Sequence, residues 1–167
     1  MTARVRPVVP ADAAAWLRRR QALWPEDEGD GGHAKEIEEF LAGRLKMPLA
    51  VFVAVDEADA PTGFVELFIR TYAEDCETDR VAYLKGWYVE PAFRRLAVGR
   101  ALIAASEQWG RDQGCTEFGS DALIDDAISA AAHEALGFAE TVQIRCFKKN
   151  LQNLRFADRG RLLHWRP

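Results

Sequence analysis

The amino-acid sequence predicts an α/β (α+β) domain in which helices flank a mostly antiparallel sheet with one parallel step. Two patterns carry this prediction. Short β-branched runs, bounded by turn-forming residues, alternate along the chain with segments whose apolar residues recur at helical spacing. Residues 81–120 also follow the order strand, helix, strand, which requires a crossover between two parallel strands. The length of 167 residues suits one domain with one continuous core.

Two helices are expected in the N-terminal third of the chain. The first follows Asp12, a good N-cap residue, and stops at Pro25. An acidic, glycine-bearing loop over residues 26–32 separates it from the second, whose apolar residues share one face over 37–45 and which ends before Pro48. These two helices are expected to form a pair.

Three strands are expected next. Residues 49–55 and 64–72 are β-branched and aromatic runs around a turn, and this arrangement indicates an antiparallel hairpin. The third run, residues 81–89, contains Gly86, which suggests either a bulge or the close approach of a ligand.

The second half of the domain is expected to contain two helices and two strands. A helix starts at Val98 and ends at Gly114, and residues 115–120 form a short strand. The next helix closes at Gly137-Phe138, and residues 141–147 form the last strand. Residues 1–150 then make up the single domain. Residues 151–167 are a C-terminal arm that packs on the body or on a partner subunit, or stays free.

Composition and charge limit the classes of function. With 22 Lys and Arg against 26 Asp and Glu, the net charge of −4 argues against a nucleic-acid binder and mildly favours a cationic substrate. The sequence holds three cysteines without metal-ligand spacing, which predicts free thiols in a reducing compartment and no metal. No apolar run is long enough for a signal peptide or a membrane span, so a cytoplasmic protein is expected.

The junction between the third strand and the next helix is a candidate anion site. Free amides in the first turn of a helix attract a phosphate, and arginines add charge-assisted hydrogen bonds. The residues are Arg94, Arg95, Leu96, Ala97, Val98, Gly99 and Arg100. Taken alone, paired arginines before a helix are also typical of a solvated surface turn. The strand before the loop and the crossover after it favour the anion site.

This loop resembles the acetyl-CoA motif of the GNAT superfamily of N-acetyltransferases, which runs Arg or Gln, two residues, Gly, one residue, then Gly or Ala. Ala97 stands in place of the first glycine, where a methyl group crowds the phosphate or forbids a backbone angle that glycine permits. Residues 23–25, 81–91 and 114–138 extend the resemblance to the aminoglycoside 6'-N-acetyltransferases.

The resemblance implies a GNAT fold with a splayed parallel strand pair and about four helices. It also implies acetylation of an aminoglycoside 6'-amine by acetyl-CoA, which confers antibiotic resistance, in an enzyme that is commonly a homodimer. The backbone of Trp87, Tyr88 and Val89 would pair with the pantetheine arm, and the Val89 amide would bind the thioester carbonyl. Asp126 would lie near the cofactor, where the family usually has asparagine.

The resemblance also assigns the acceptor side. Trp24 and Tyr72 would line it, and Asp121 would contact the amine and help to deprotonate it. His133 stands where many GNAT proteins have a tyrosine that protonates the leaving thiolate. Without the family, Asp121 equally suits a turn and His133 a packed helix residue. Lys85 replaces the usual glutamate, which reverses a charge that faces the cationic sugar.

Two alternatives stay open. The first is a GNAT enzyme for a different amine, such as one whose carboxylate pairs with Lys85. The second is a CoA-binding module with weak or no catalysis, which Ala97, Lys85 and Asp126 together suggest.

Overall fold

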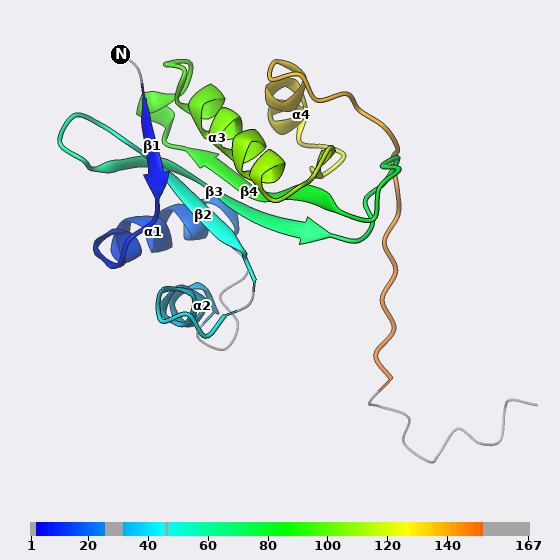
Figure 1. Cartoon of the computed structure of the whole chain (residues 1–167), viewed down its shortest axis with the longest axis horizontal. Coiled ribbons are helices and arrows are strands. Elements are labelled where there is room, and N and C mark those ends of the chain that lie inside the picture. The colour runs from blue at the N-terminus through cyan, green and yellow to red at the C-terminus, as the bar shows by residue number, and fades with distance from the viewer. Residues whose placement is uncertain (1–2, 26–31, 46, 152–167) are drawn as a thin grey trace, which may run out of the picture.

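The computed structural model describes residues 3–25, 32–45 and 47–151. Five strands form one sheet in the order β1-β2-β3-β4-β5, in which only β4 and β5 run parallel (Figure 1). The strands are β1 (Arg4–Pro7), β2 (Ala50–Val55), β3 (Pro61–Arg70), β4 (Val81–Val89) and β5 (Phe118–Ser120). The helices are α1 (Ala13–Leu23), α2 (Gly32–Leu41), α3 (Val98–Asp112) and α4 (Ala127–Glu134), with 3-10 turns η1 (Pro10–Asp12) and η3 (Pro91–Phe93). The predicted fold class is confirmed.

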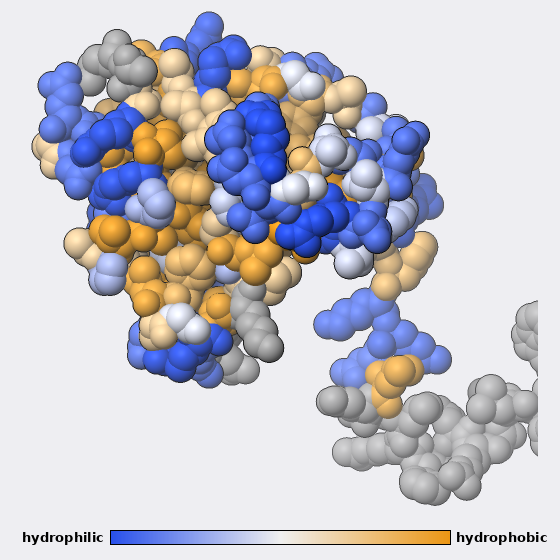
Figure 2. Space-filling view, viewed as in Figure 1, coloured by the Kyte–Doolittle hydropathy of each residue, from blue (hydrophilic) through white to orange (hydrophobic). Residues whose placement is uncertain are grey.

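The sheet lies between two helical layers, because its strands alternate apolar side chains between the two faces. On one face Val53 and Phe64 pack with Trp16 of α1 and Ile37 of α2. The opposite face packs on α3, and this core contains Ala54, Val65, Leu67, Leu84, Val98, Leu102 and Ile103. Figure 2 shows that the outward sides of α2 and α3 are hydrophilic.

The sequence did not predict β1. Its four residues include two arginines, so they lack the apolar alternation that indicates a strand. β1 pairs with β2, and Arg6 binds the buried carboxylate of Asp12 at 2.7 Å. Asp12, expected to cap the first helix, instead accepts the amide of Val9 at 2.9 Å and makes no side-chain cap to α1.

Glycines with left-handed backbone set three helix ends. α2 ends at Leu41, before the predicted limit, because Gly43 takes φ +70° and the Arg44 amide bonds back to Glu39 at 2.9 Å. The predicted close at Gly137 is confirmed. Gly137 has φ +93°, and the Phe138 amide reaches the carbonyl of His133 at 3.2 Å. Gly114, with φ +79°, follows α3 in the same way.

The prediction of a last strand over residues 141–147 is wrong for the single chain. The segment is extended and exposed, and within the described residues it pairs with no strand. β5 is also shorter than predicted, with three residues instead of six. Figure 1 shows the chain leaving the domain after α4. A strand needs a neighbour with which to share hydrogen bonds, and the described part of the chain places none beside this segment.

Two further predictions concern the C-terminal arm and the cysteines. The proposed arm lies outside the described residues, except for Leu151. Cys76, Cys115 and Cys146 are free thiols, as the sequence predicts. Among the described helices, none has the length and apolar character needed to span a membrane.

Candidate active site

A β-bulge at Lys85 decides which amides of β4 face outward. Leu84 pairs with Leu67 and Gly86 with Glu66, so Lys85 is the extra residue. Before the bulge, the Ala82 amide points to β5, where it bonds to Glu117 at 3.1 Å. A strand directs successive amides to alternate sides, so the inserted residue switches the series from even to odd numbers.

Beyond the bulge, the amides of Trp87 and Val89 therefore point away from β3. The Glu90 amide bonds to the carbonyl of Thr62 on β3 at 3.0 Å, so the preceding residue faces the other side. Pairing with β5 has ended there, at Leu84 and Ser120. The amides of Trp87 and Val89 thus line an open edge between two diverging parallel strands.

Arg94 joins this edge to the loop that follows. Its Nε donates to the carbonyl oxygen of Val89 at 3.0 Å, and its guanidinium carbon lies 5.9 Å from the Tyr88 ring centroid. The carbonyl and amide of one strand residue point to the same side, so this bond also fixes the Val89 amide at the open edge.

In the loop before α3, Ala97 adopts the left-handed backbone conformation that the motif normally gives to a glycine. Ala97, the N-cap of α3, has φ 65° and ψ 2°, and Arg95 has φ 62°. These are left-handed angles that cost a non-glycine residue about 1–2 kcal/mol each. The expectation that the methyl group of Ala97 forbids this angle is therefore wrong, because the loop adopts the angle at the cost of strain.

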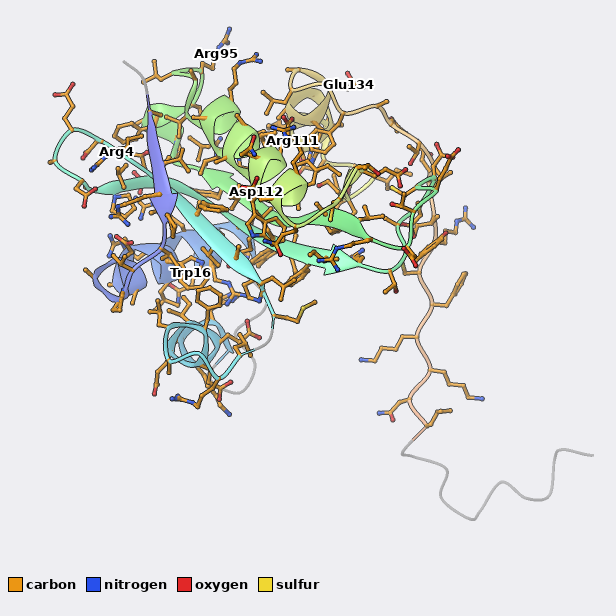
Figure 3. All side chains as sticks on the ribbon, in the orientation of Figure 1. Arg4, Trp16, Arg95, Arg111, Asp112 and Glu134 are labelled. Carbon is orange, nitrogen blue, oxygen red and sulfur yellow. The ribbon has the colours of Figure 1, made fainter. Side chains whose placement is uncertain are left out.

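The first turn of α3 supplies charge and free amides. The amides of Val98, Gly99 and Arg100 come too early in the helix for an intrahelical partner. Arg95 and Arg100 are exposed, and Figure 3 shows Arg95 pointing into solvent above the start of the helix. A Cβ on Gly99 would lie 2.7 Å from Cζ2 of Trp87, so glycine lets the helix start pack against β4. Leu96 is 54% exposed.

Asp121 is held in place by Tyr83, a residue that the sequence analysis missed. The buried Tyr83 hydroxyl donates to Oδ1 of Asp121 at 2.8 Å. Burial and the neighbouring carboxylate raise the pKa of Tyr83, so its hydroxyl stays a neutral donor. The guanidinium group of Arg70 covers the ring of Tyr83, with its carbon 3.4 Å from the ring centroid. No local sequence pattern signals this contact, because Tyr83 and Asp121 lie 38 residues apart in the chain.

Trp24 and Lys85 meet on the same face of the sheet. Trp24 lies directly against Gly86, where any Cβ would overlap the indole ring. The sequence suggested either a bulge or the close approach of a ligand at Gly86. The structure has the bulge, and the group that approaches Gly86 is the Trp24 side chain. Lys85 is exposed, and its Nζ lies 5.0 Å from the Trp24 ring centroid and 5.9 Å from that of Phe68.

A buried ion pair underlies this aromatic group. Glu66 is fully buried on β3, accepts the indole N–H of Trp16 at 2.9 Å and lies 3.0 Å from Nε of Arg20. Burial raises the pKa of Glu66, and the charge of Arg20 opposes this effect. The guanidinium carbon of Arg20 also lies 5.4 Å from the Trp24 ring centroid. The Glu66–Arg20 pair therefore packs against Trp24 through the Arg20 guanidinium.

The remaining predicted residues occupy different settings. Nε2 of His133 lies 2.9 Å from Oγ of Ser120, so α4 contacts the end of β5. Asp126 accepts the Ser129 amide at 2.9 Å and caps α4. Its contact with a cofactor stays a prediction. Tyr72 is 67% exposed beyond β3, and its acceptor role stays a prediction too.

Known proteins are similar to this chain over most of its length. Residues 14–138 match the acetyltransferase (GNAT) family. The chain is 49% identical over 147 residues to the aminoglycoside N(6')-acetyltransferase type 1 of Klebsiella aerogenes, across 88% of this chain and 96% of that protein. It is 38% identical over 149 residues to the protein of the same name from Stenotrophomonas maltophilia, across 89% and 94%.

Solved structures are similar over the same length. AAC(6')-Iy in complex with the bisubstrate analogue CoA-S-monomethyl-acetylneamine has a TM-score of 0.80 and 33% identity, over 90% of this chain and 99% of that one. AAC(6')-Ih from Acinetobacter baumannii has a TM-score of 0.78 and 32% identity, over 90% and 99%.

The strained loop yields a stability prediction. In Ala97→Gly the relief of left-handed strain offsets the extra entropy of the unfolded chain, so we expect a change of less than about 0.5 kcal/mol. Ala101→Gly, inside α3, should instead destabilise by about 1 kcal/mol. Urea unfolding of both variants measures the difference. Equal losses at the two positions would contradict the assigned backbone of Ala97.

Proposed function

The chain belongs to the GNAT acetyltransferase family, and from this we propose that it transfers the acetyl group of acetyl-CoA to the 6'-amine of an aminoglycoside, which would confer resistance. One observation carries the proposal. The outward amides of Trp87 and Val89 lead straight into the arginine-bearing start of α3, while Asp121 lies past the end of the neighbouring strand β5. The curated relatives at 49% and 38% identity carry the name of this activity.

The open edge and the loop suit the co-substrate. A pyrophosphate needs free amides and cations, which the first turn of α3 and the exposed Arg95 and Arg100 provide. An extended pantetheine arm needs unpaired strand amides, and Trp87 and Val89 have them. The Val89 amide is placed to donate to the thioester carbonyl, whose oxygen gains charge as the amine attacks. Solved structures of AAC(6')-Iy contain CoA or a CoA-linked analogue.

Asp121 suits the role of proton acceptor for the amine. An ammonium must lose its proton before its nitrogen can attack a carbonyl. Asp121 is exposed, and Tyr83 fixes one of its oxygens while the other remains available. We therefore assign to Asp121 the orientation and deprotonation of the acceptor amine, directly or through a water molecule.

Turnover of aminoglycosides tests the proposed function. Release of CoA thiol from acetyl-CoA should depend on kanamycin or tobramycin, and the product should carry one acetyl group on the 6'-amine by mass spectrometry and NMR. Asp121→Asn should lower kcat about 100-fold or more. The matched variant Asp125→Asn, at an exposed residue four positions along, should retain activity. Protein that binds CoA but acetylates no aminoglycoside would refute the proposal.

Lys85 supports a second candidate acceptor. Its ammonium lies against Trp24 and Phe68, where a cationic sugar would meet repulsion of about 1 kcal/mol in water and more in a drier cleft. An amine that also carries a carboxylate would be attracted instead. A substrate screen that includes amino acids and polyamines distinguishes the two classes.

Reversal of this charge gives a direct prediction. Lys85→Glu should raise kcat/KM for kanamycin, since repulsion becomes attraction, and about 1–2 kcal/mol corresponds to roughly 5- to 30-fold. Lys85→Met, which keeps the stem and removes the charge, should give an intermediate value. Steady-state kinetics with both variants checks this. An unchanged or lower value for Lys85→Glu would show that the lysine does not face the acceptor.

We further propose that the enzyme is a homodimer. The extended segment 141–147 exposes Val142 by 53%, Ile144 by 60% and Phe147 by 92%, and its backbone lacks a strand partner within the described chain. The outer edge of β5 likewise pairs with no strand among the residues that the structure describes. A second copy provides each with the pairing that the other needs.

The free thiols of the described cysteines also support a reducing compartment, the cytoplasm.

If residues 141–147 form the dimer interface, substitutions on only one face of this segment should change the oligomeric state. Ile144→Asp should convert the protein to a monomer, because it buries a charge in the new interface. Gln143→Asp, whose side chain alternates to the opposite side, serves as the matched control and should leave the dimer intact. Sedimentation velocity measures both. A monomeric wild-type protein would contradict the proposal.

A further inference from the structure

Ser120 and His133 form a hydrogen-bonded pair at the point where β4 and β5 separate. Oγ of Ser120 lies 2.9 Å from Nε2 of His133 and 3.3 Å from the carbonyl oxygen of Leu84. Ser120 is the last residue of β5, and Leu84 is the last residue of β4 that pairs with it. The hydroxyl therefore lies at the apex of the opening that Trp87 and Val89 line.

The second nitrogen of the imidazole fixes the tautomer. Nδ1 of His133 lies 2.8 Å from the carbonyl oxygen of Ser129, and a carbonyl can only accept, so Nδ1 carries hydrogen in both charge states. In the neutral ring, Nε2 accepts from the Ser120 hydroxyl. In the protonated ring, Nε2 donates to Oγ, and the hydroxyl then donates to the carbonyl oxygen of Leu84 at 3.3 Å or to a ligand that takes its place. The pair thus has two fully bonded states that differ by one proton.

Two aromatic side chains hold the imidazole in this orientation. The His133 ring meets Trp87 edge to face with centroids 5.7 Å apart, and meets Phe138 in the same way at 5.2 Å. Phe138 is set in turn by the left-handed Gly137 that closes α4. The position of the ring therefore follows from the end of the helix and does not depend on a ligand.

Ser120 and Asp121 are consecutive, so their side chains point to opposite sides of the strand end. Asp121 turns toward Tyr83, and Ser120 turns toward His133 of α4. Amide formation releases a proton from the amine and requires a proton on the sulfur. The two adjacent residues thus provide an acceptor on one side and a donor on the other.

We propose that Ser120 gives its hydroxyl proton to the departing CoA thiolate and that His133 replaces it. As the C–N bond forms and the C–S bond breaks, the electron pair of the C–S bond stays on sulfur, which takes the proton of Ser120. Oγ then takes the Nε2 proton of a protonated His133, and solvent restores that proton between turnovers. This inference rests on the proposed acetyl transfer and names the donor within that site.

Four variants test the relay. Ser120→Ala and His133→Phe each remove one member, and we expect each to lower kcat about 100-fold, the lower end of the range for general acids, because an alkyl thiolate is a good leaving group. The double variant should be no slower than the slower single variant, because the two residues act as one unit. Ser120→Thr, which keeps the hydroxyl, should restore the rate. Thr116→Ala is the matched control for loss of an exposed hydroxyl.

Two measurements separate a relay from a structural role. Calorimetry should give the same Kd for acetyl-CoA in wild type and Ser120→Ala. In the ligand-free protein, the ¹⁵N signals of the His133 ring should show hydrogen on Nδ1, and Ser120→Ala should shift Nε2 while Nδ1 stays. A weakened Kd, a lowered Tm without loss of kcat, or an unshifted Nε2 would overturn the relay.

The assay also separates this inference from the proposed acceptor. Thiol release is measured with an aminoglycoside and with water alone, since the same thiolate leaves in both reactions. A wild-type enzyme that ignores aminoglycosides, but whose thioester hydrolysis falls in Ser120→Ala, would remove the acceptor and retain the relay. Full thiol release by Ser120→Ala in both reactions would remove the relay and leave the proposed function intact.

Discussion

The bulge at Lys85 is the constraint on which the site depends. Without the extra residue, β4 would direct the amides of Gly86 and Tyr88 outward, and those of Trp87 and Val89 would be used up in the ladder with β3. Gly86 allows the bulge to pack, since Trp24 occupies the space of its missing side chain. One inserted residue therefore directs the open edge toward the loop before α3 and lets Trp24 pack against β4.

The two sides of the site are held by different kinds of interaction. Around Trp24 and Asp121, which we propose to face the acceptor, buried polar groups do the positioning: Glu66 and Arg20 support Trp24, and Tyr83 holds Asp121. These contacts are costly to break, because a lost partner leaves a buried polar group unsatisfied. On the donor side, the backbone supplies most of the chemistry, through strand amides and a helix start. Lys85, the bulged residue, is exposed beside Trp24 and takes no part in these buried contacts.

Much of this arrangement could be predicted from the sequence. Strand β4 was predicted with its observed bounds, and the loop, the parallel step and the close of α4 at Gly137 followed from turn chemistry and periodicity. Contacts between distant segments could not be predicted. Neither the Ser120–His133 pair nor the Tyr83–Asp121 bond leaves a local pattern, and β1 forms only because β2 offers an edge. The predicted last strand, 141–147, failed for the same reason: among the described residues no strand lies beside it, and its own sequence does not show this.

Backbone NMR during a titration with CoA tests the central claim most directly. If the bulge sets the open edge, the amide signals of Trp87, Val89 and Gly99 should shift and gain protection from exchange. The amide of Tyr88, already bonded within the sheet, should change least. Saturation with CoA that leaves the Val89 amide unaffected, or that perturbs Tyr88 in its place, would show that the edge does not bind the co-substrate.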